Sequence, residues 1–128
     1  MNYQTLPLNS LAMVIEDNPQ LSYIFSQSLS AAGYSVTSIA NGQEAINKLE
    51  SIQPILVILD IQLPGASGCK VLDFIRNSTV LKYTWVIVAT SEPNMAVTMH
   101  QSADLVLIKP VSYIQLRDLA VRFRKTVK

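Results

Sequence analysis

The chain has 128 residues, a size that fits a single domain. Hydrophobic residues make up 49% and charged residues 15%, and this apolar composition indicates either a face that packs on a partner or simply a large core. The net charge of +1 provides no strong field for nucleic acid or an anionic membrane, and no apolar run approaches the ~18 residues of a membrane span. The lone Cys69 forms no internal disulfide, and the first residues lack a signal-peptide pattern. We therefore expect a cytoplasmic protein that binds neither nucleic acid nor membrane directly. Its core is expected at about residues 11–123, with an N-terminal extension over residues 1–10.

The first predicted elements are a strand and a helix. Leu11–Ile15 is continuously apolar, which is typical of a central parallel strand covered on both faces. Asn18 and Pro19 then suit the cap and the first turn of a helix, and Gly33 provides its stop. The apolar side of this helix recurs at helical spacing and is expected to be buried. Its members are Leu21, Ile24, Phe25, Ser28 and Leu29.

The next strand and helix carry more polar residues. Tyr34–Ile39 mixes β-branched residues with serine, so it suits a strand near the edge of the sheet. Asn41 is placed to cap a second helix, with Glu44 three residues later as in a capping box, and the helix is expected to end before Pro54. Its buried side is predicted to consist of Ala45, Ile46 and Leu49.

The second half of the chain repeats the alternation three times. Three more continuously apolar runs predict central strands, namely Ile55–Leu59, Val86–Ala89 and Leu105–Ile108. A third helix is expected from Ser67 to about Asn77 and a last one from Ser112, whereas the segment Glu92–Gln101 has the weakest helical pattern. The predicted inward residues are Val71, Leu72 and Ile75 in the third helix and Leu116, Leu119, Ala120 and Phe123 in the last.

Strand and helix alternate five times along the chain, which predicts the α/β class. Right-handed crossovers place helices on both faces of a parallel sheet. We therefore expect a three-layer, doubly wound (βα)5 sandwich of the flavodoxin-like kind, with a parallel five-stranded sheet in the order 2-1-3-4-5. No repeat, low-complexity tract or linker indicates a second domain.

Polar residues follow four of the predicted strands. Glu16 and Asp17 follow the first, Asp60 the third, Thr90 the fourth and Lys109 the fifth. Ligands of such sheets bind beyond the carboxyl ends of the strands, so these side chains should meet at one edge. Converging carboxylates repel one another unless a cation compensates, and Mg²⁺ fits best because it takes oxygen ligands together with phosphate.

These residue types indicate phosphoryl transfer. Asp60 is the candidate nucleophile, because a carboxylate can accept a phosphoryl group covalently. Lys109 and the metal would neutralise charge on the phosphoryl oxygens, and the Thr90 hydroxyl would donate to one of them.

The same residues, in this order, resemble the receiver domain of bacterial response regulators. The resemblance covers about Leu11 to Phe123, and its five-part spacing makes it specific. It rests on Glu16-Asp17, on Asp60-Ile61-Gln62-Leu63-Pro64-Gly65 with Gly68, on Thr90 and on Lys109-Pro110.

The resemblance implies a set of roles. Asp17 and Asp60 would bind Mg²⁺ directly, Gln62 would contribute its backbone carbonyl, and Glu16 would act through water. The phosphoryl donor would be a phosphohistidine on a sensor histidine kinase or on a histidine phosphotransfer protein. Phosphorylation would shift the conformation and control a partner or an output domain, so the chain would be no enzyme beyond assisting its own phosphotransfer and dephosphorylation.

Two features depart from the family pattern. Family members usually have Tyr or Phe three residues before the lysine, where this chain has Val106. The stretch from Thr90 to Lys109 is also about three residues shorter than usual, so helix 4 is expected to be short or irregular. Both departures fall on the helix 4, strand 5 and helix 5 face, through which the resemblance implies contact with an output domain or a second copy.

Three other functions compete with this one. A phosphatase with an Asp nucleophile would carry a second acid where this chain has Gln62, and a flavin or nucleotide binder would need a phosphate-cradling loop where Glu16 and Asp17 would repel phosphate. The remaining alternative is a receiver-like interaction module that signals without phosphorylation, which Val106 and the short fourth helix support. A Mg²⁺-dependent response to a phosphoryl mimic would separate it from a phosphoacceptor.

Overall fold

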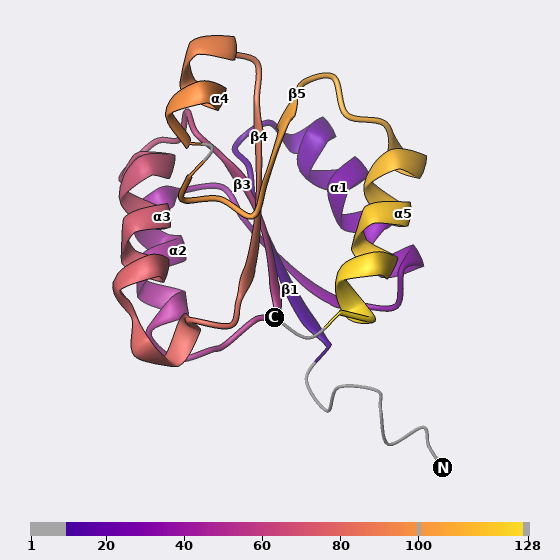
Figure 1. The fold of residues 1–128 in the computed structure, drawn as a ribbon, viewed down its shortest axis with the longest axis horizontal. Coiled ribbons are helices and arrows are strands. Elements are labelled where there is room, and N and C mark those ends of the chain that lie inside the picture. The colour runs from indigo at the N-terminus through magenta and orange to yellow at the C-terminus, as the bar shows by residue number, and fades with distance from the viewer. Residues whose placement is uncertain (1–9, 100, 127–128) are drawn as a thin grey trace.

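A parallel five-stranded sheet forms the centre of the molecule (Figure 1). The computed structural model describes residues 10–99 and 101–126, so the extension predicted at residues 1–10 lies, apart from Ser10, outside the described residues. The strands are β1 (Leu11–Ile15), β2 (Ser35–Ile39), β3 (Leu56–Asp60), β4 (Trp85–Thr90) and β5 (Leu105–Ile108). Their order is β2-β1-β3-β4-β5, all neighbours are parallel, and the predicted topology is confirmed.

The helices cover both faces of the sheet. Figure 1 shows α1 and α5 on one side and α2, α3 and α4 on the other. Their bounds are α1 (Pro19–Ala31), α2 (Gly42–Leu49), α3 (Gly68–Asn77), α4 (Pro93–Met99) and α5 (Tyr113–Arg124), with a short 3-10 turn at Thr79–Leu81. The predicted caps are present, since the side chains of Asn18, Asn41, Ser67 and Ser112 each accept backbone N–H bonds from the first turn of their helices. Within the described part of the chain, no helix is both long and apolar enough to cross a membrane.

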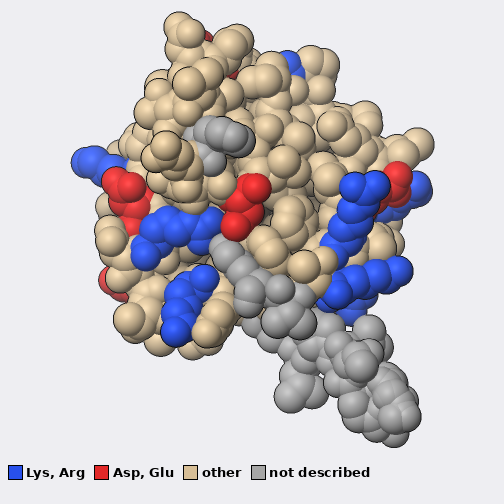
Figure 2. Space-filling view, in the orientation of Figure 1, with Lys and Arg blue, Asp and Glu red and all other residues tan. Residues whose placement is uncertain are grey.

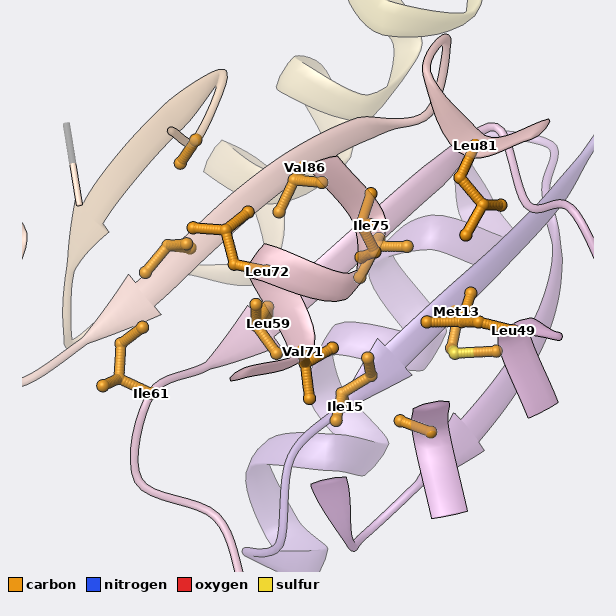
Figure 3. Packing of buried hydrophobic residues seen from close by; sticks show 14 of the residues in the cluster. Met13, Ile15, Leu49, Leu59, Ile61, Val71, Leu72, Ile75, Leu81 and Val86 are labelled. Carbon is orange, nitrogen blue, oxygen red and sulfur yellow. The ribbon is translucent and has the colours of Figure 1, made fainter. Parts of the chain in front are cut away.

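Two hydrophobic cores lie on the two faces of the sheet. Successive strand residues point to opposite faces, so Met13 and Val57 pack under α2 and α3, whereas the adjacent Ala12 and Leu56 pack under α1 and α5. Figure 3 shows the first core, in which Leu59, Val71, Leu72, Ile75 and Val86 are all fully buried or nearly so. Burying one such side chain contributes roughly 1.5–3 kcal/mol, and the strands are thereby held rigidly.

Two sequence predictions about burial are wrong. Leu105–Ile108 is predicted as a central strand, but β5 is the last strand of the sheet and Ile108 is 47% exposed. The strand is apolar because Val106 packs towards one core while Leu105 and Leu107 pack towards the other. An apolar run of this kind does not reveal that the strand lies at the edge of the sheet. Ile24 is predicted to be buried but is 38% exposed, because the buried side of α1 is narrower and consists of Phe25, Ser28 and Leu29.

The connection between α4 and β5 is short and is anchored to α3. As predicted, α4 is a short helix, with seven residues. Arg76 of α3 donates from Nε to the Ser102 carbonyl oxygen (2.6 Å), and its Nη2 forms an ion pair with Asp104 (2.8 Å). Another Arg76 nitrogen donates to the Thr84 carbonyl oxygen (3.3 Å), and the same Asp104 oxygen accepts the Val86 N–H (2.8 Å). One guanidinium therefore ties α3 to the amino ends of β4 and β5.

Candidate functional site

The predicted site residues meet at the carboxyl ends of the strands. Backbone pairing continues just past the strands, because the Glu16 N–H donates to the Ile39 carbonyl oxygen (3.0 Å) and the Lys109 N–H donates to that of Thr90 (2.8 Å). Asp60 is the last residue of β3, in register with Ala89 of β4. The strands themselves therefore place these side chains, and the sequence-based prediction of one shared edge is confirmed.

Three carboxylates form the centre of the site. Oxygens of Glu16, Asp17 and Asp60 lie within 4.8 Å of one another. Glu16 and Asp60 are 2% and 7% exposed, respectively, whereas Asp17 is open to solvent. Two backbone amides partly satisfy the buried acids, since the Asn18 N–H donates to Glu16 (3.2 Å) and the Gln62 N–H donates to Asp60 (3.3 Å).

Lys109 is the cation that the cluster contacts among the described residues. Its Nζ lies 2.8 Å from a Glu16 oxygen and 3.5 Å from an Asp60 oxygen. Burial raises the pKa of Glu16, and the hydrogen bond from Lys109 opposes that rise. One ammonium against three carboxylates leaves the cluster with a surplus of negative charge.

Thr90 ends β4 beside this cluster and is almost fully buried, at 1% exposure. Its hydroxyl oxygen accepts the Glu92 N–H at 3.0 Å. A hydroxyl that accepts one hydrogen bond still has its own hydrogen to donate, so the predicted role of Thr90 as a donor to a bound group is compatible with this contact.

The loop that follows Asp60 is shaped by two glycines. Gly65 has a φ of 81°, a conformation that residues with a Cβ rarely adopt. The Gly68 N–H donates to the Ile61 carbonyl oxygen (2.8 Å), and a Cβ at Gly68 would collide with the carbonyl oxygen of Asp60. Both glycines thus hold the backbone of the loop that begins directly after Asp60 and contains Gln62.

The donor set fits a hard divalent cation. Carboxylate oxygens are the ligands that Mg²⁺ prefers, and it usually takes one or two of them together with water and phosphate. Asp60 and the solvent-exposed Asp17 belong to the three-carboxylate group, and a cation there would offset the surplus charge. The predicted contribution of the Gln62 carbonyl stays a prediction, because the bond seen at Gln62 is made by its N–H.

Sequence reasoning missed two contacts, one at the site and one at the opposite end of the sheet. The bond from the Glu92 N–H to Thr90 links the site to the start of α4, and its only sequence signal is a threonine shortly before a helix. The bond between Arg76 and Asp104 joins residues 28 positions apart. No local pattern predicts such a pair, because it depends on how α3 and β5 pack.

Comparison with known proteins identifies the kind of domain that has this site. A family model described as the response regulator receiver domain matches residues 12–121. The transcriptional regulatory protein TrcR of Mycobacterium tuberculosis is 32% identical over 88% of this chain and 43% of its own length. The polar-differentiation response regulator DivK of Brucella anthropi is 33% identical over 62% of this chain and 64% of its own length.

Solved structures agree with the sequence relatives. The response regulator TrrA of Thermotoga maritima, in complex with Mg²⁺ and BeF, has a TM-score of 0.79 and 28% identity, covering 89% of this chain and 98% of that one. The receiver domain of a histidine kinase from Syntrophus aciditrophicus has a TM-score of 0.80 and 25% identity, covering 90% of this chain and 89% of that one. The chain spans about half the length of the transcriptional regulators that it matches, at 43% and 50% of the first two.

Proposed function

Because the chain belongs to the response regulator receiver domain family, we propose that Asp60 is its phosphoryl acceptor and that Mg²⁺ assists the transfer. Receiver domains are the phosphoacceptor modules of two-component signalling, and they bind Mg²⁺ in an acidic pocket. The observation that carries the assignment to Asp60 is the meeting of three carboxylates within 4.8 Å. Lys109 adds the cation that a phosphoryl group requires, 3.5 Å from Asp60.

The transfer step follows from the side chains. A carboxylate oxygen of Asp60 attacks the phosphorus of a phosphohistidine, so that a P–O bond forms while the P–N bond breaks. The leaving imidazole nitrogen keeps the electron pair of that bond and is protonated from solvent. Lys109 then turns from Glu16 to a phosphoryl oxygen, and the Thr90 hydroxyl donates to another. Phosphoryl transfer depends mainly on such positioning and charge stabilisation.

The proposal also assigns the residues that bind the metal. We infer that Asp17 and Asp60 bind Mg²⁺ directly, that the Gln62 backbone carbonyl adds a third ligand, and that Glu16 acts through water. When bound, Mg²⁺ neutralises charge on the carboxylates and on the transferred oxygens. The placement of Glu16 supports its indirect role, because Lys109 and the Asn18 N–H already occupy its two oxygens.

The partners follow from the same family. Receiver domains interact with histidine kinases and histidine phosphotransfer proteins, and we propose one of these as the donor.

We also propose that the receiver core spans about residues 11–123 and that its output uses the α4–β5–α5 face, through a partner domain or a second copy. This face exposes Val97 (79%) and Ile108 (47%) around a hollow of about 280 Å³ lined by Ala96, Val97, Val106 and Ile108. Val106 leaves the hollow open where family members usually carry an aromatic ring.

Intact mass spectrometry after incubation with phosphoramidate and Mg²⁺ tests the assignment. We expect one phosphoryl increment on the wild-type chain and none after Asp60→Asn or in the presence of a chelator. Asp73→Asn, which removes an exposed carboxylate on α3, is the matched control and should leave the increment unchanged. No increment in folded protein that binds Mg²⁺ would favour an interaction module that signals without phosphorylation.

A further inference from the structure

The two edges of the sheet, formed by β2 and β5, differ in how they are protected. A strand edge exposes backbone N–H and C=O groups, and proteins usually block it with charged residues or proline. β5 is flanked by Asp104 at one end and by Lys109 and Pro110 at the other. Figure 2 shows the face on which β5 lies in Figure 1, and acidic and basic side chains stand together on it. The β5 edge is thus protected against pairing with another strand.

The β2 edge carries no such protection. The strand Ser35–Ile39 contains no charged residue and no proline, and residues 18–43, which include all of α1 and β2, contain no Asp, Glu, Lys or Arg. Among the described residues β2 pairs with β1 alone, and Ser35 and Ser38 are exposed. An unblocked edge of this kind is a template for pairing with another strand.

The pairing with β1 shows which backbone groups point out of the β2 edge. The Ser35 N–H donates to the carbonyl oxygen just before β1, and the Ile39 carbonyl oxygen accepts the N–H just after β1, both at 3.0 Å. Backbone groups alternate between the two sides of a strand, so the odd-numbered residues of β2 point to β1. Val36 and Ser38 therefore direct their N–H and C=O groups to the open edge.

The described helices leave space on both sides of this edge. A hollow of about 510 Å³ lies beside α2 and another of about 400 Å³ lies beside α1. Ser38, Ile39 and Ala40 line both hollows. The end of β2 thus stands between two open spaces, and a second strand can reach the outward groups of Val36 and Ser38.

The β2 edge is complementary to itself. A dimer with two-fold symmetry uses the same surface of both copies, so an antiparallel pair of two β2 strands is centred on one residue. With Thr37 at the centre, Val36 of each copy faces Ser38 of the other. The two Thr37 side chains then form a cross-strand threonine pair, which stabilises a sheet.

The hollow beside α2 is complementary to itself in charge. Glu44 and Lys48 both line it, and both are exposed. The two-fold axis reverses the direction of α2, so Glu44 of one copy faces the later part of the other α2, which carries Lys48. An exposed ion pair of this kind adds little affinity. It does favour the two-fold arrangement over arrangements that bring like charges together.

We propose that two copies of this chain associate through their β2 edges, in antiparallel register about Thr37, so that the two sheets become one continuous sheet. Val36 and Ser38 of each copy exchange backbone hydrogen bonds with Ser38 and Val36 of the other. The contact involves one short strand and its flanking helices, so the dimer is weak. It forms at the edge of the sheet opposite β5 and does not depend on the role of Asp60.

Sedimentation equilibrium of the full, unphosphorylated chain tests the dimer. We expect the average mass to rise from that of a monomer towards that of a dimer between about 10 µM and about 1 mM. Proline is tolerated on an edge strand where its nitrogen faces outwards, so Ser38→Pro removes an intermolecular donor and keeps the pairing with β1. Ser38→Lys places a charge of the kind that blocks natural edges. Each variant should raise the dissociation constant by roughly tenfold or more.

A matched charge and a local probe complete the design. Val97→Lys adds the same charge at a 79% exposed position of α4, on the face proposed for output, and should leave the association unchanged. Amide hydrogen exchange measured by NMR locates the contact. Exchange at Val36 and Ser38 should slow as the protein concentration rises, whereas the amides of β5 should not respond. Urea midpoints check that each variant is folded.

Three results would overturn this proposal. The first is a chain that stays monomeric up to about 1 mM. The second is an association that persists unchanged in both Ser38→Pro and Ser38→Lys. The third is a dimer that Val97→Lys dissociates, or one in which exchange slows at β5 and not at Val36 and Ser38, because the contact would then lie at the opposite edge of the sheet.

Discussion

The sheet carries a cluster of charged side chains at each end, and the two clusters differ in balance. At the amino ends of β4 and β5, Arg76 pairs with Asp104 at 2.8 Å and also donates to two backbone carbonyls. At the carboxyl ends, Glu16 and Asp60 share the ammonium of Lys109, and Asp17 adds a third carboxylate to the same cluster of described residues. In the first cluster a cation is paired with an anion, whereas the described residues of the second include more carboxylates than ammonium groups.

This difference separates a structural cluster from a functional one. A buried ion pair with satisfied hydrogen bonds holds elements together, and removing one partner strands the other. An unbalanced cluster weakens the fold until a cation joins it, because like charges in a partly buried place repel one another. The carboxyl-end cluster is therefore the one that should respond to a ligand, and four measurements test this contrast between the two clusters.

The largest effect is expected from Arg76→Ala. The substitution removes the guanidinium from Asp104, whose side chain is only 16% exposed, and from the carbonyl oxygens of Ser102 and Thr84, which accept hydrogen bonds from it. Because both side chains retain some solvent contact, we expect a loss of about 2 kcal/mol in the free energy of unfolding, below the loss for a fully buried pair. Urea denaturation measures it.

Arg117→Ala provides the control for Arg76→Ala. Arg117 pairs with Asp118 at 3.1 Å, but the two side chains are 39% and 58% exposed. Such a surface pair contributes little, so its loss should alter stability by less than ~0.5 kcal/mol. Equal losses in the free energy of unfolding for Arg76→Ala and Arg117→Ala would mean that the cluster at the amino ends does not stabilise the fold more than a surface ion pair does.

The second effect is stabilisation by Mg²⁺. A ligand that binds only the folded state adds about 1.4 kcal/mol at a free concentration tenfold above its Kd. We expect that gain for the wild-type chain in urea titrations and its loss in Asp17→Asn. An unchanged Mg²⁺ response in Asp17→Asn would show that the metal, if bound, lies outside the acid cluster.

The third effect has the opposite sign from that of Arg76→Ala. In protein freed of divalent ions, Asp60→Asn removes one of the repelling charges while keeping the side-chain shape, so the free energy of unfolding should rise by about 1 kcal/mol. Asp73→Asn, at an exposed position of α3, should change it by less than ~0.5 kcal/mol. A fall in stability after Asp60→Asn would mean that attraction to Lys109 outweighs the repulsion and that both ends of the sheet are balanced alike.

The sequence predicted the cluster at the carboxyl ends of the strands but not the cluster at the amino ends. The carboxyl-end residues directly follow apolar strands, and parallel strands bring their ends to one edge, so Glu16, Asp60 and Lys109 could be placed together from the pattern alone. Arg76 and Asp104 sit in a helix and a loop with no shared motif, and only packing joins them. The edge position of β5 and the exposure of Ile24 were missed for a related reason. The spacing of apolar residues shows which side chains are apolar, but it does not show whether another strand or helix covers them.

The smallest effect is a pH dependence of stability that arises from Glu16 in the carboxyl-end cluster. Burial raises the pKa of Glu16 in the folded state above its ordinary value of 4.5, although the hydrogen bond from Lys109 limits the rise. The folded protein then holds this proton more tightly than the unfolded chain does, so the resulting stability is present below the unfolded-state pKa and is lost as pH rises through the folded-state pKa.

The substitution Glu16→Gln tests this in protein freed of divalent ions by a chelator. The variant should gain stability relative to the wild type as pH rises above 4.5, and the difference should reach a plateau once Glu16 is ionised in both the folded and the unfolded state. Urea midpoints measured across this range provide the comparison, with Glu44→Gln on the exposed side of α2 as the control. A relative stability that stays flat with pH would show that Lys109 fully compensates Glu16, and the surplus charge would then reside on Asp17 and Asp60.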